Sequence, residues 1–276
     1  MSGRVFVGNS AMRLIFLLLA FITAQSWAGP MEDALAAHKR GYHGAELKIL
    51  QSLAARGNSE AQFSLGLKYS QGHGVVKDNA DALMWIRLAA AQGSVKAQSH
   101  LGFEYSWGSG IVPLDYAEAV KWYRLAADQG DESAQYDLGH LYSEGKGVNQ
   151  DYIDAVKWFR LAASQGYDMA QFRLGLSYRK NQGVPQDNAE AVSWFKLAAA
   201  QGNYFAQAEL GIMYGSGAGL GQDYVRAHMW ASLAAVSGGP IESLKLDLIS
   251  KQMTPQQIAE AQKLARECQA RDFKGC

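Results

Sequence analysis

The sequence predicts an all-α fold built from a row of helical hairpins, and three observations support this prediction. An Ala-Gln pair returns every 36 residues, with one step of 37, at Ala61-Gln62, Ala97-Gln98, Ala134-Gln135, Ala170-Gln171 and Ala206-Gln207. A tryptophan keeps the same period, at Trp85, Trp122, Trp158, Trp194 and Trp230. The apolar residues of each unit follow helical spacing. A fixed period of this length indicates stacked supersecondary units rather than one globular core.

Each unit contains two amphipathic helices, as the unit 131–166 illustrates. Its first helix has a face formed at offsets 0, 4, 5 and 8 by Ala134, Leu138, Gly139 and Tyr142. Its second helix has a face formed at offsets 0, 3, 6 and 7 by Ala155, Trp158, Leu161 and Ala162. Small Ala and Gly residues let helices approach closely, and the tryptophans are expected to be interior contacts between repeats.

Glycines and capping residues mark the ends of these helices. Five glycines close the second helices, namely Gly57, Gly93, Gly130, Gly166 and Gly202. Four of them precede an N-cap residue for the next first helix, at Asn58, Ser94, Asp131 and Asn203, whereas Tyr167 breaks this rule. The Gly-rich turn inside each unit ends at an aspartate that can cap the second helix, at Asp78, Asp115, Asp151, Asp187 and Asp223. The 37-residue step comes from an extra residue between Gly110 and Asp115.

These residues form the pattern A-Q-x-x-L-G-x-x-Y-x-x-G-x-G-V-x-x-D-x-x-x-A-x-x-W-x-x-x-A-A-x-x-G, which resembles the Sel1-like repeat family, relatives of the tetratricopeptide repeats. The match covers roughly residues 57–238. It departs from the pattern at Asn181, which replaces the first turn glycine, and in the last turn, Gly217-Ala218-Gly219-Leu220. The resemblance implies a right-handed α/α solenoid that binds proteins. Exported bacterial members of the family act as scaffolds or as regulators of envelope signalling and host contact.

The segments outside the repeats predict export and two terminal caps. Residues 1–28 resemble a secretory signal peptide, because Arg13 precedes the apolar run 14–23 and the small residues Ser26 and Ala28 suit cleavage after Ala28. Met12 is an alternative start, and an uncleaved signal anchor is an alternative interpretation. After cleavage no stable membrane span is expected, and the location is periplasmic or secreted.

Both ends of the array are expected to be divergent, because a terminal repeat meets water on one side. Residues 29–57 form a divergent N-terminal hairpin, residues 58–238 five Sel1-like repeats, and residues 239–276 a helical C-terminal cap. In this cap, Thr254 begins a capping box. Cys268 and Cys276 are expected to form a disulfide in an oxidising compartment, with a redox site as the alternative.

Charge and motif content argue against catalysis and nucleic-acid binding. The chain has 26 basic and 26 acidic residues, so no basic face for nucleic acid is implied. The S-x-x-K spacings beginning at Ser193 and Ser143 fall on ordinary repeat positions, and the six histidines show no metal-ligand spacing. We therefore predict no catalytic residue, cofactor or metal. The runner-up function is a peptidoglycan- or β-lactam-interacting protein of the cysteine-rich Sel1-like type, although the repeats here lack its cysteine pairs.

Residues that vary between copies are the candidates for binding a protein partner. Counted from the first-helix alanine, offset 3 reads Ser64, His100, Asp137, Arg173 and Glu209, and offset 7 includes Lys68 and Glu104. A solvated face with no partner is the alternative for each. Trp107 lies outside the repeated tryptophan position and forms a stripe with His100 and Phe103. It is either an aromatic anchor for the partner or a residue that packs on Pro113 in the lengthened turn.

Overall fold

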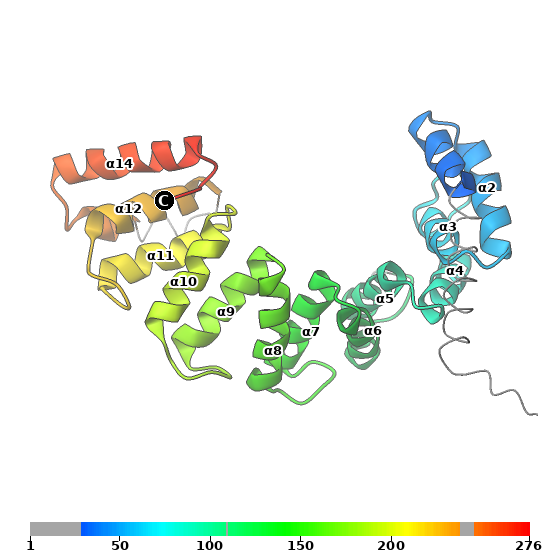
Figure 1. The fold of residues 1–276 in the computed structure, drawn as a ribbon, viewed down its shortest axis with the longest axis horizontal. Coiled ribbons are helices and arrows are strands. Elements are labelled where there is room, and N and C mark those ends of the chain that lie inside the picture. Colours follow the sequence, from blue (N-terminus) through cyan, green and yellow to red (C-terminus); the bar gives the residue numbers. More distant parts are fainter. Residues whose placement is uncertain (1–28, 109, 238–245) are drawn as a thin grey trace, which may run out of the picture. The chain divides into compact units, whose positions relative to one another are not determined.

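The computed structural model describes residues 29–108, 110–237 and 246–276, and every regular element in these ranges is a helix (Figure 1). The chain divides into two compact units, residues 1–114 and 115–276. Within each unit, consecutive helices pack against one another as hairpins, which confirms the all-α class. The signal peptide predicted for residues 1–28 lies outside the described residues and stays a prediction.

The first unit contains a helical segment at residues 29–39 followed by four helices. These are α2 (His43–Ala55), α3 (Ser59–Gln71), α4 (Asn79–Ala91) and α5 (Val95–Trp107). Each packs on the next, so the divergent N-terminal hairpin covers the first helix of the first repeat. In each repeat the first helix is one of α3, α5, α7, α9 and α11.

Among the described residues, the second unit contains eight helices of at least 12 residues and a short helical segment at residues 246–250. The helices are α6 (Tyr116–Asp128), α7 (Glu132–Glu144), α8 (Tyr152–Ser164), α9 (Asp168–Lys180), α10 (Asn188–Ala199), α11 (Tyr204–Ser216), α12 (Tyr224–Ser237) and α14 (Pro255–Ala270). Helix α14 packs on α12 and so covers the last repeat.

The predicted caps are confirmed residue by residue. Asn58, Ser94, Asp131 and Asn203 each accept a hydrogen bond from the backbone amide three residues on. Tyr167 makes no such bond, as its side chain predicts. The turn aspartates Asp78, Asp115, Asp151 and Asp187 each accept two amide hydrogen bonds at the start of the second helix. These carboxylates are therefore structural caps, and Asn181 adopts the left-handed conformation that glycine has in the other copies.

A buried glutamine explains why the Ala-Gln pair recurs. Gln171 is 5 % exposed, and its side-chain amide donates to the Ala163 carbonyl in the preceding helix. Its Oε1 accepts a hydrogen bond of 2.9 Å from Gln201, which lies at the end of the next second helix. The same pair of bonds links Gln135 with Gln165 and Gln62 with Gln92. A buried amide with both functions satisfied joins three consecutive helices and fixes their register.

In four of the five copies, the residue after the recurring tryptophan lies deeper than the tryptophan. Trp158 is half-buried, whereas Phe159 is 3 % exposed. Phe159 lies four residues after buried Ala155 and three before buried Ala162, so these three share the core-facing stripe of α8. The sequence predicts that the tryptophans are interior contacts between repeats. Trp230 is buried, at 2 % exposed, whereas the other four are half-buried, and of these Trp85 and Trp194 pack against core clusters.

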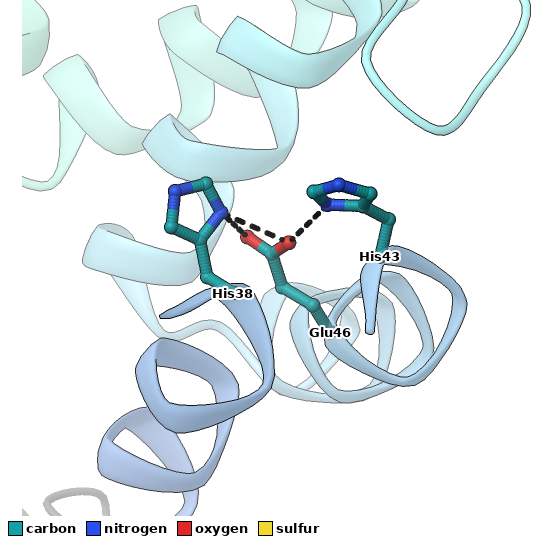
Figure 2. A group of neighbouring side chains, drawn as sticks. All are labelled: His38, His43 and Glu46. Atoms are coloured by element: carbon teal, nitrogen blue, oxygen red, sulfur yellow. Dashed lines mark hydrogen bonds and ion pairs between the residues drawn. The ribbon is translucent and has the colours of Figure 1, made fainter. Parts of the chain in front are cut away.

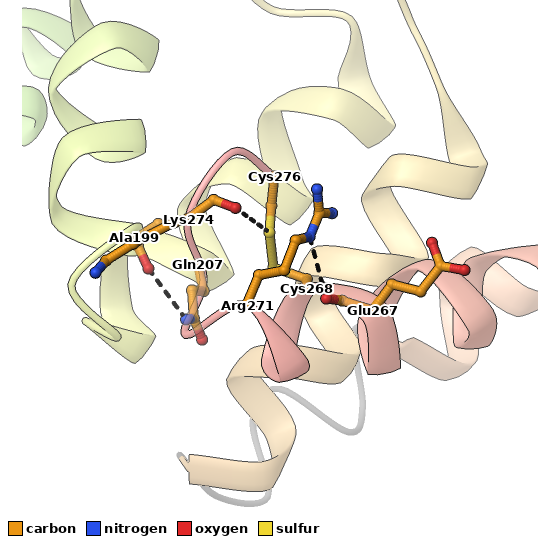
Figure 3. The surroundings of a disulfide bond; sticks show 7 residues. All are labelled: Ala199, Gln207, Glu267, Cys268, Arg271, Lys274 and Cys276. Atoms are coloured by element: carbon orange, nitrogen blue, oxygen red, sulfur yellow. Dashed lines mark hydrogen bonds between the residues drawn. A yellow bond between two sulfur atoms is a disulfide. The ribbon is translucent and has the colours of Figure 1, made fainter.

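The C-terminal cap is closed by a disulfide between Cys268 and Cys276 (Figure 3). Cys268 is fully buried near the end of α14 and belongs to the same apolar cluster as Phe195 and Leu210. Thr254 and Gln257 exchange the two hydrogen bonds of the predicted capping box. Residues 239–245 of the predicted C-terminal cap lie outside the described residues. Among the helices the structure describes, none combines the length and the apolarity needed to cross a bilayer.

Candidate functional site

The variable residues of the first helices separate into buried and accessible positions. We define the variable stripe as offsets 3, 6 and 10 from the first-helix alanine. Offset 10 is exposed in all five copies, at Gln71, Trp107, Glu144, Lys180 and Ser216. Offset 7, in contrast, is buried in every copy, at Lys68, Glu104, Leu141, Ser177 and Met213.

The assignment of Lys68 and Glu104 to an accessible partner surface is therefore wrong. In α3 and α5 the residues at offsets 0, 4 and 7 share the stripe that faces the core, because helical side chains recur at i, i+4 and i+7. Lys68 is 8 % exposed and Glu104 is 5 % exposed. The accessible part of each first helix is the variable stripe next to this buried line.

The variable stripe of α5 carries an exposed aromatic pair. Phe103 is 45 % exposed and Trp107 is 72 % exposed. Their ring centroids lie 6.0 Å apart with an interplanar angle of 33°, which is within the range of favourable aromatic contacts. Two large aromatic side chains thus lie side by side in water, whereas most other aromatic side chains of the described residues are half-buried or buried.

Trp107 is the last residue of α5, and the lengthened turn does not cover it. The helix ends at Gly108, which adopts φ 61°. A Cβ on Gly108 would lie 3.1 Å from the backbone nitrogen of Leu114, so the turn folds back onto the glycine. The exposure of Trp107 shows that Pro113 does not bury it, so of the two alternatives left open by the sequence the packed one is wrong.

His100, the third member of this stripe, lies about one helical turn before Phe103 and packs against α3. Its ring contacts Phe63 edge-on at a centroid distance of 5.6 Å, and its Nε2 lies 3.4 Å from a Glu104 carboxylate oxygen. Burial lowers the pKa of His100, and the neighbouring Glu104 charge opposes that shift. His100 is therefore a largely neutral packing residue with a small accessible edge.

A polar pocket of about 220 Å³ lies beside the variable stripe of α7 and α9. Its lining includes Glu144, Arg173, Ser177 and Lys180. Lys146 lies 2.7 Å from Glu144, and this hydrogen bond is the main reason why the pKa of that carboxyl is below its usual value. The Nε of Arg173 is buried without a hydrogen-bond partner among the described residues. The pocket is therefore lined by two cationic side chains, Arg173 and Lys180, and by one carboxylate that is already paired.

The remaining candidates are internal to the fold. Burial raises the pKa of Asp137 to about 6, with a hydrogen bond from Tyr123 opposing the shift. Glu209 pairs with Arg179 of the preceding first helix. Lys68 lies 2.8 Å from the Glu46 carboxylate in α2, and Ser64 lines a cavity of about 440 Å³ with residues of the N-terminal hairpin. Asp137, Glu209 and Lys68 are thus paired with other residues of the protein. In contrast, Phe103 and Trp107 are exposed, and Arg173 borders the polar pocket.

Comparison with known proteins identifies the repeats. The Sel1 repeat model matches residues 59–94, 95–131, 132–167, 168–203 and 205–238, which together are more than half of the chain. The chain is a Sel1 repeat protein. None of the curated proteins compared with the chain gives a significant match. Sel1 repeat proteins are generally scaffolds for protein interaction.

Two solved structures resemble this Sel1 repeat protein closely. One is a Sel1 repeat protein from Oxalobacter formigenes, with 32% identity and a TM-score of 0.75, where the match covers 85% of this chain and 98% of that one. The other is a protective antigen of uropathogenic Escherichia coli with an SLR fold, at 38% identity and a TM-score of 0.73. The match covers 80% of this chain but 48% of that one, so this chain spans about half the length of the antigen.

The serine motifs of this Sel1 repeat protein are placed as ordinary helix residues. The Ser193 hydroxyl donates to the Glu190 carbonyl at 2.8 Å and is exposed on α10. The Ser143 hydroxyl donates to the His140 carbonyl at 2.8 Å near the end of α7. The Ser193 hydroxyl also lies 3.5 Å from the carboxylate of Glu190 on the same helix. Hydrogen bonds from serine to its own helix are common on helix surfaces. No observation in the described residues favours the β-lactam alternative.

Sequence reasoning missed two groups of polar residues. Glu144 and Lys180 line the pocket with Arg173, and aligning offset 10 across the copies would have placed them on the same stripe as Trp107. The second group, His38, His43 and Glu46, lies in the N-terminal hairpin outside the repeats. Its signal is the spacing His-x4-His-x2-Glu, which crosses a turn.

Proposed function

We propose that this Sel1 repeat protein is an exported, non-enzymatic scaffold that binds a protein partner through Phe103 and Trp107. The observation that carries the proposal is the exposed aromatic pair on α5. Large aromatic side chains dominate the binding energy of protein interfaces, and they cluster near the centre of the contact. Four other first helices have polar or charged residues where Trp107 stands, so the repeat frame does not require a tryptophan there.

Arg173 supplies a second contact of different chemistry in the second unit. Its guanidinium borders the polar pocket together with Lys180, and the one acidic residue there, Glu144, is already paired with Lys146. A carboxylate is the group that a guanidinium binds best. The preferred partner therefore presents an exposed apolar or aromatic side chain and, for the second unit, an acidic side chain.

Export is supported by the signal-like segment ending at Ala28 and by the disulfide Cys268–Cys276. Disulfides form and persist mainly in oxidising compartments such as the periplasm or the extracellular space. The similarity to a protective antigen of uropathogenic Escherichia coli favours an envelope setting, where the partner would take part in envelope signalling or host contact.

Site-specific photo-crosslinking tests the proposal. A photoreactive phenylalanine analogue at position 107, in protein expressed with its own export signal, should form a defined crosslinked product in the envelope fraction. The matched control is the same analogue at Val76, which is apolar and 87 % exposed but lies in a turn. The partner is then identified from the crosslinked band and purified.

Binding of the purified partner is measured next by calorimetry. Trp107→Ala should weaken binding by at least about 2 kcal/mol, roughly 30-fold in Kd, while the melting temperature stays within about 1 °C of wild type. Val76→Ala should change neither quantity. Equal crosslinking from both positions, or wild-type affinity in Trp107→Ala, would refute the aromatic pair as the binding site.

A further inference from the structure

The N-terminal hairpin brings two imidazoles and one carboxylate together (Figure 2). The Nδ1 of His38 lies 3.2 Å from the Glu46 carboxylate, and the Nδ1 of His43 lies 3.6 Å from Oε2 of the same group. Gly41, with φ 74°, reverses the chain between residues 29–39 and α2. Because His38 ends one helix and His43 begins the next, a spacing of five residues across this turn places both rings over Glu46.

These separations fit the coordination shell of a small divalent metal ion. With metal–nitrogen and metal–oxygen bonds of about 2.0–2.2 Å, two ligand atoms of a tetrahedral site lie about 3.3–3.6 Å apart. The two histidine-to-carboxylate distances, 3.2 and 3.6 Å, span this range. Ligand atoms of all three residues lie within 4.8 Å of one another, the one such group among the described residues. Closure needs only rotation of two imidazoles whose side chains are 57 % and 59 % exposed.

The environment of Glu46 holds the carboxylate in place. Its side chain is 8 % exposed, and Lys68 binds Oε1 at 2.8 Å, which leaves Oε2 as the oxygen nearest His43. The Nδ1 of His38 lies 3.2 Å from the same carboxylate, so Lys68 and His38 both orient it. A carboxylate oriented by an outer hydrogen bond is typical of metal sites. The Lys68 charge also limits the affinity, since it repels a cation.

We propose that His38, His43 and Glu46 bind a divalent transition-metal ion of the zinc class, which staples residues 29–39 to α2. Two imidazoles and a carboxylate are ligands that Zn²⁺ accepts, with one position left for water or for a further donor. The cavity of about 440 Å³ that His38 and Glu46 help to line leaves room for that donor. The site lies apart from Phe103 and Trp107 in the chain and does not rest on the proposed function.

Zinc titration of the tag-free chain, stripped with a chelator and dialysed, tests the proposal. We expect one equivalent of Zn²⁺ to bind and to raise the melting temperature, because a ligand that binds only the folded state stabilises it. His43→Ala should lower the zinc affinity by more than about 10-fold. Even the loss of a residue that only hydrogen-bonds to a metal ligand usually costs about 10-fold or more. His43 is exposed, so this variant should fold, and circular dichroism checks that it does. Both cysteines are in the disulfide and do not compete for the metal.

Spectroscopy and a control variant distinguish a specific coordination site from nonspecific binding of metal ions to surface residues. Co²⁺ in place of Zn²⁺ should give the strong visible absorption of a tetrahedral site in the wild type, and His43→Ala should lose it. His140→Ala is the matched control, because His140 has a single carboxylate neighbour, Glu144 at 3.4 Å, and this variant should bind Zn²⁺ as the wild type does. Zinc affinity that is unchanged in His43→Ala, or the absence of a stoichiometric site, would show that the cluster is held only by hydrogen bonds. Trp107→Ala should leave zinc affinity unchanged, so the two proposals fail independently.

Discussion

Phe159→Ala should destabilise the second unit more than Trp158→Ala, although tryptophan is the recurring residue. Phe159 is 3 % exposed, and its ring packs on Gly139 of α7 so closely that a Cβ there would lie 2.9 Å from the ring. Trp158 next to it is only half-buried. The two substitutions sit on adjacent residues of one helix, so helix propensity and capping are the same for both.

The expected loss of stability follows from the apolar area that each side chain buries and from the cavity that its removal leaves. Full burial of a phenylalanine contributes about 1.5–3 kcal/mol by transfer from water. The cavity left between α7 and α8 adds to this loss, giving about 3–5 kcal/mol for Phe159→Ala. Trp158 is in contact with water in the folded state, so we expect its replacement by alanine to cost roughly 1–2 kcal/mol.

Urea denaturation followed by far-UV circular dichroism measures both losses. Repeat arrays can unfold in parts, so the transition should also be recorded by tryptophan fluorescence, and the two curves compared for each variant. A loss in Trp158→Ala that equals or exceeds the loss in Phe159→Ala would refute the assignment of the core-facing stripe of the second helices.

Two further predictions test the interior of the second unit. The pKa of Asp137 is raised by burial from 3.8 to about 6, so the folded state binds the proton more tightly and this group's contribution to stability is lost as the pH rises through that value. Lowering the pH from 7 to 5 should therefore add about 1 kcal/mol of stability, and Asp137→Asn should remove that part of the dependence in urea titrations at the two pH values. Gly175→Ala should cost about 1–3 kcal/mol, because the new Cβ would lie 2.6 Å from the Phe195 ring. Gly221→Ala, where no atom lies within 4 Å and φ is ordinary, is its control and should change thermal stability little.

The fold could be predicted from the sequence because five copies of the repeat show the same pattern of helices, turns and caps. Caps such as Asn58 and Asp78 have side chains whose chemistry fits one place in a helix, and the structure puts them there. The exception at Tyr167 was visible for the same reason, since a tyrosine cannot accept the amide hydrogen bonds of an N-cap.

The sequence did not predict as well how deeply each residue of a helix is buried. Recurrence marks both Trp158 and its neighbour, and only the rotation of α8 against α7 decides which of them meets the core. Lys68 is a clearer case, because a charged residue that varies between copies is normally exposed. It is buried here because Glu46, from the N-terminal hairpin outside the repeats, supplies the opposite charge. A partner from a non-repeated segment leaves no trace in the repeat pattern.

The candidate site was predictable only in part. Some of its residues lie on a repeated helix, whereas others are brought together by a turn outside the repeats. The exposed edge of Trp107 follows from its own helix, since the repeat pattern leaves offset 10 in water in every copy. The cluster of His38, His43 and Glu46 depends on a reversal at Gly41 that brings two helix ends together. The four residues between His38 and His43 are a spacing that zinc sites use. That spacing alone does not show that Glu46 joins the two histidines, because this depends on the turn.

The internal hydrogen bonding of the repeats bears on which residues are available to bind a partner. Gln62, Gln135 and Gln171 each satisfy their buried amides within the array, through one bond to the helix before and one from the helix after. Gln207 begins the last copy, and its Oε1 is buried with no partner among the described residues. The array thus ends where this alternation stops, and the disulfide-closed cap covers that end. Because these glutamines are hydrogen-bonded within the array, we expect a partner to be bound by residues that do not recur, of which Trp107 is the most exposed aromatic.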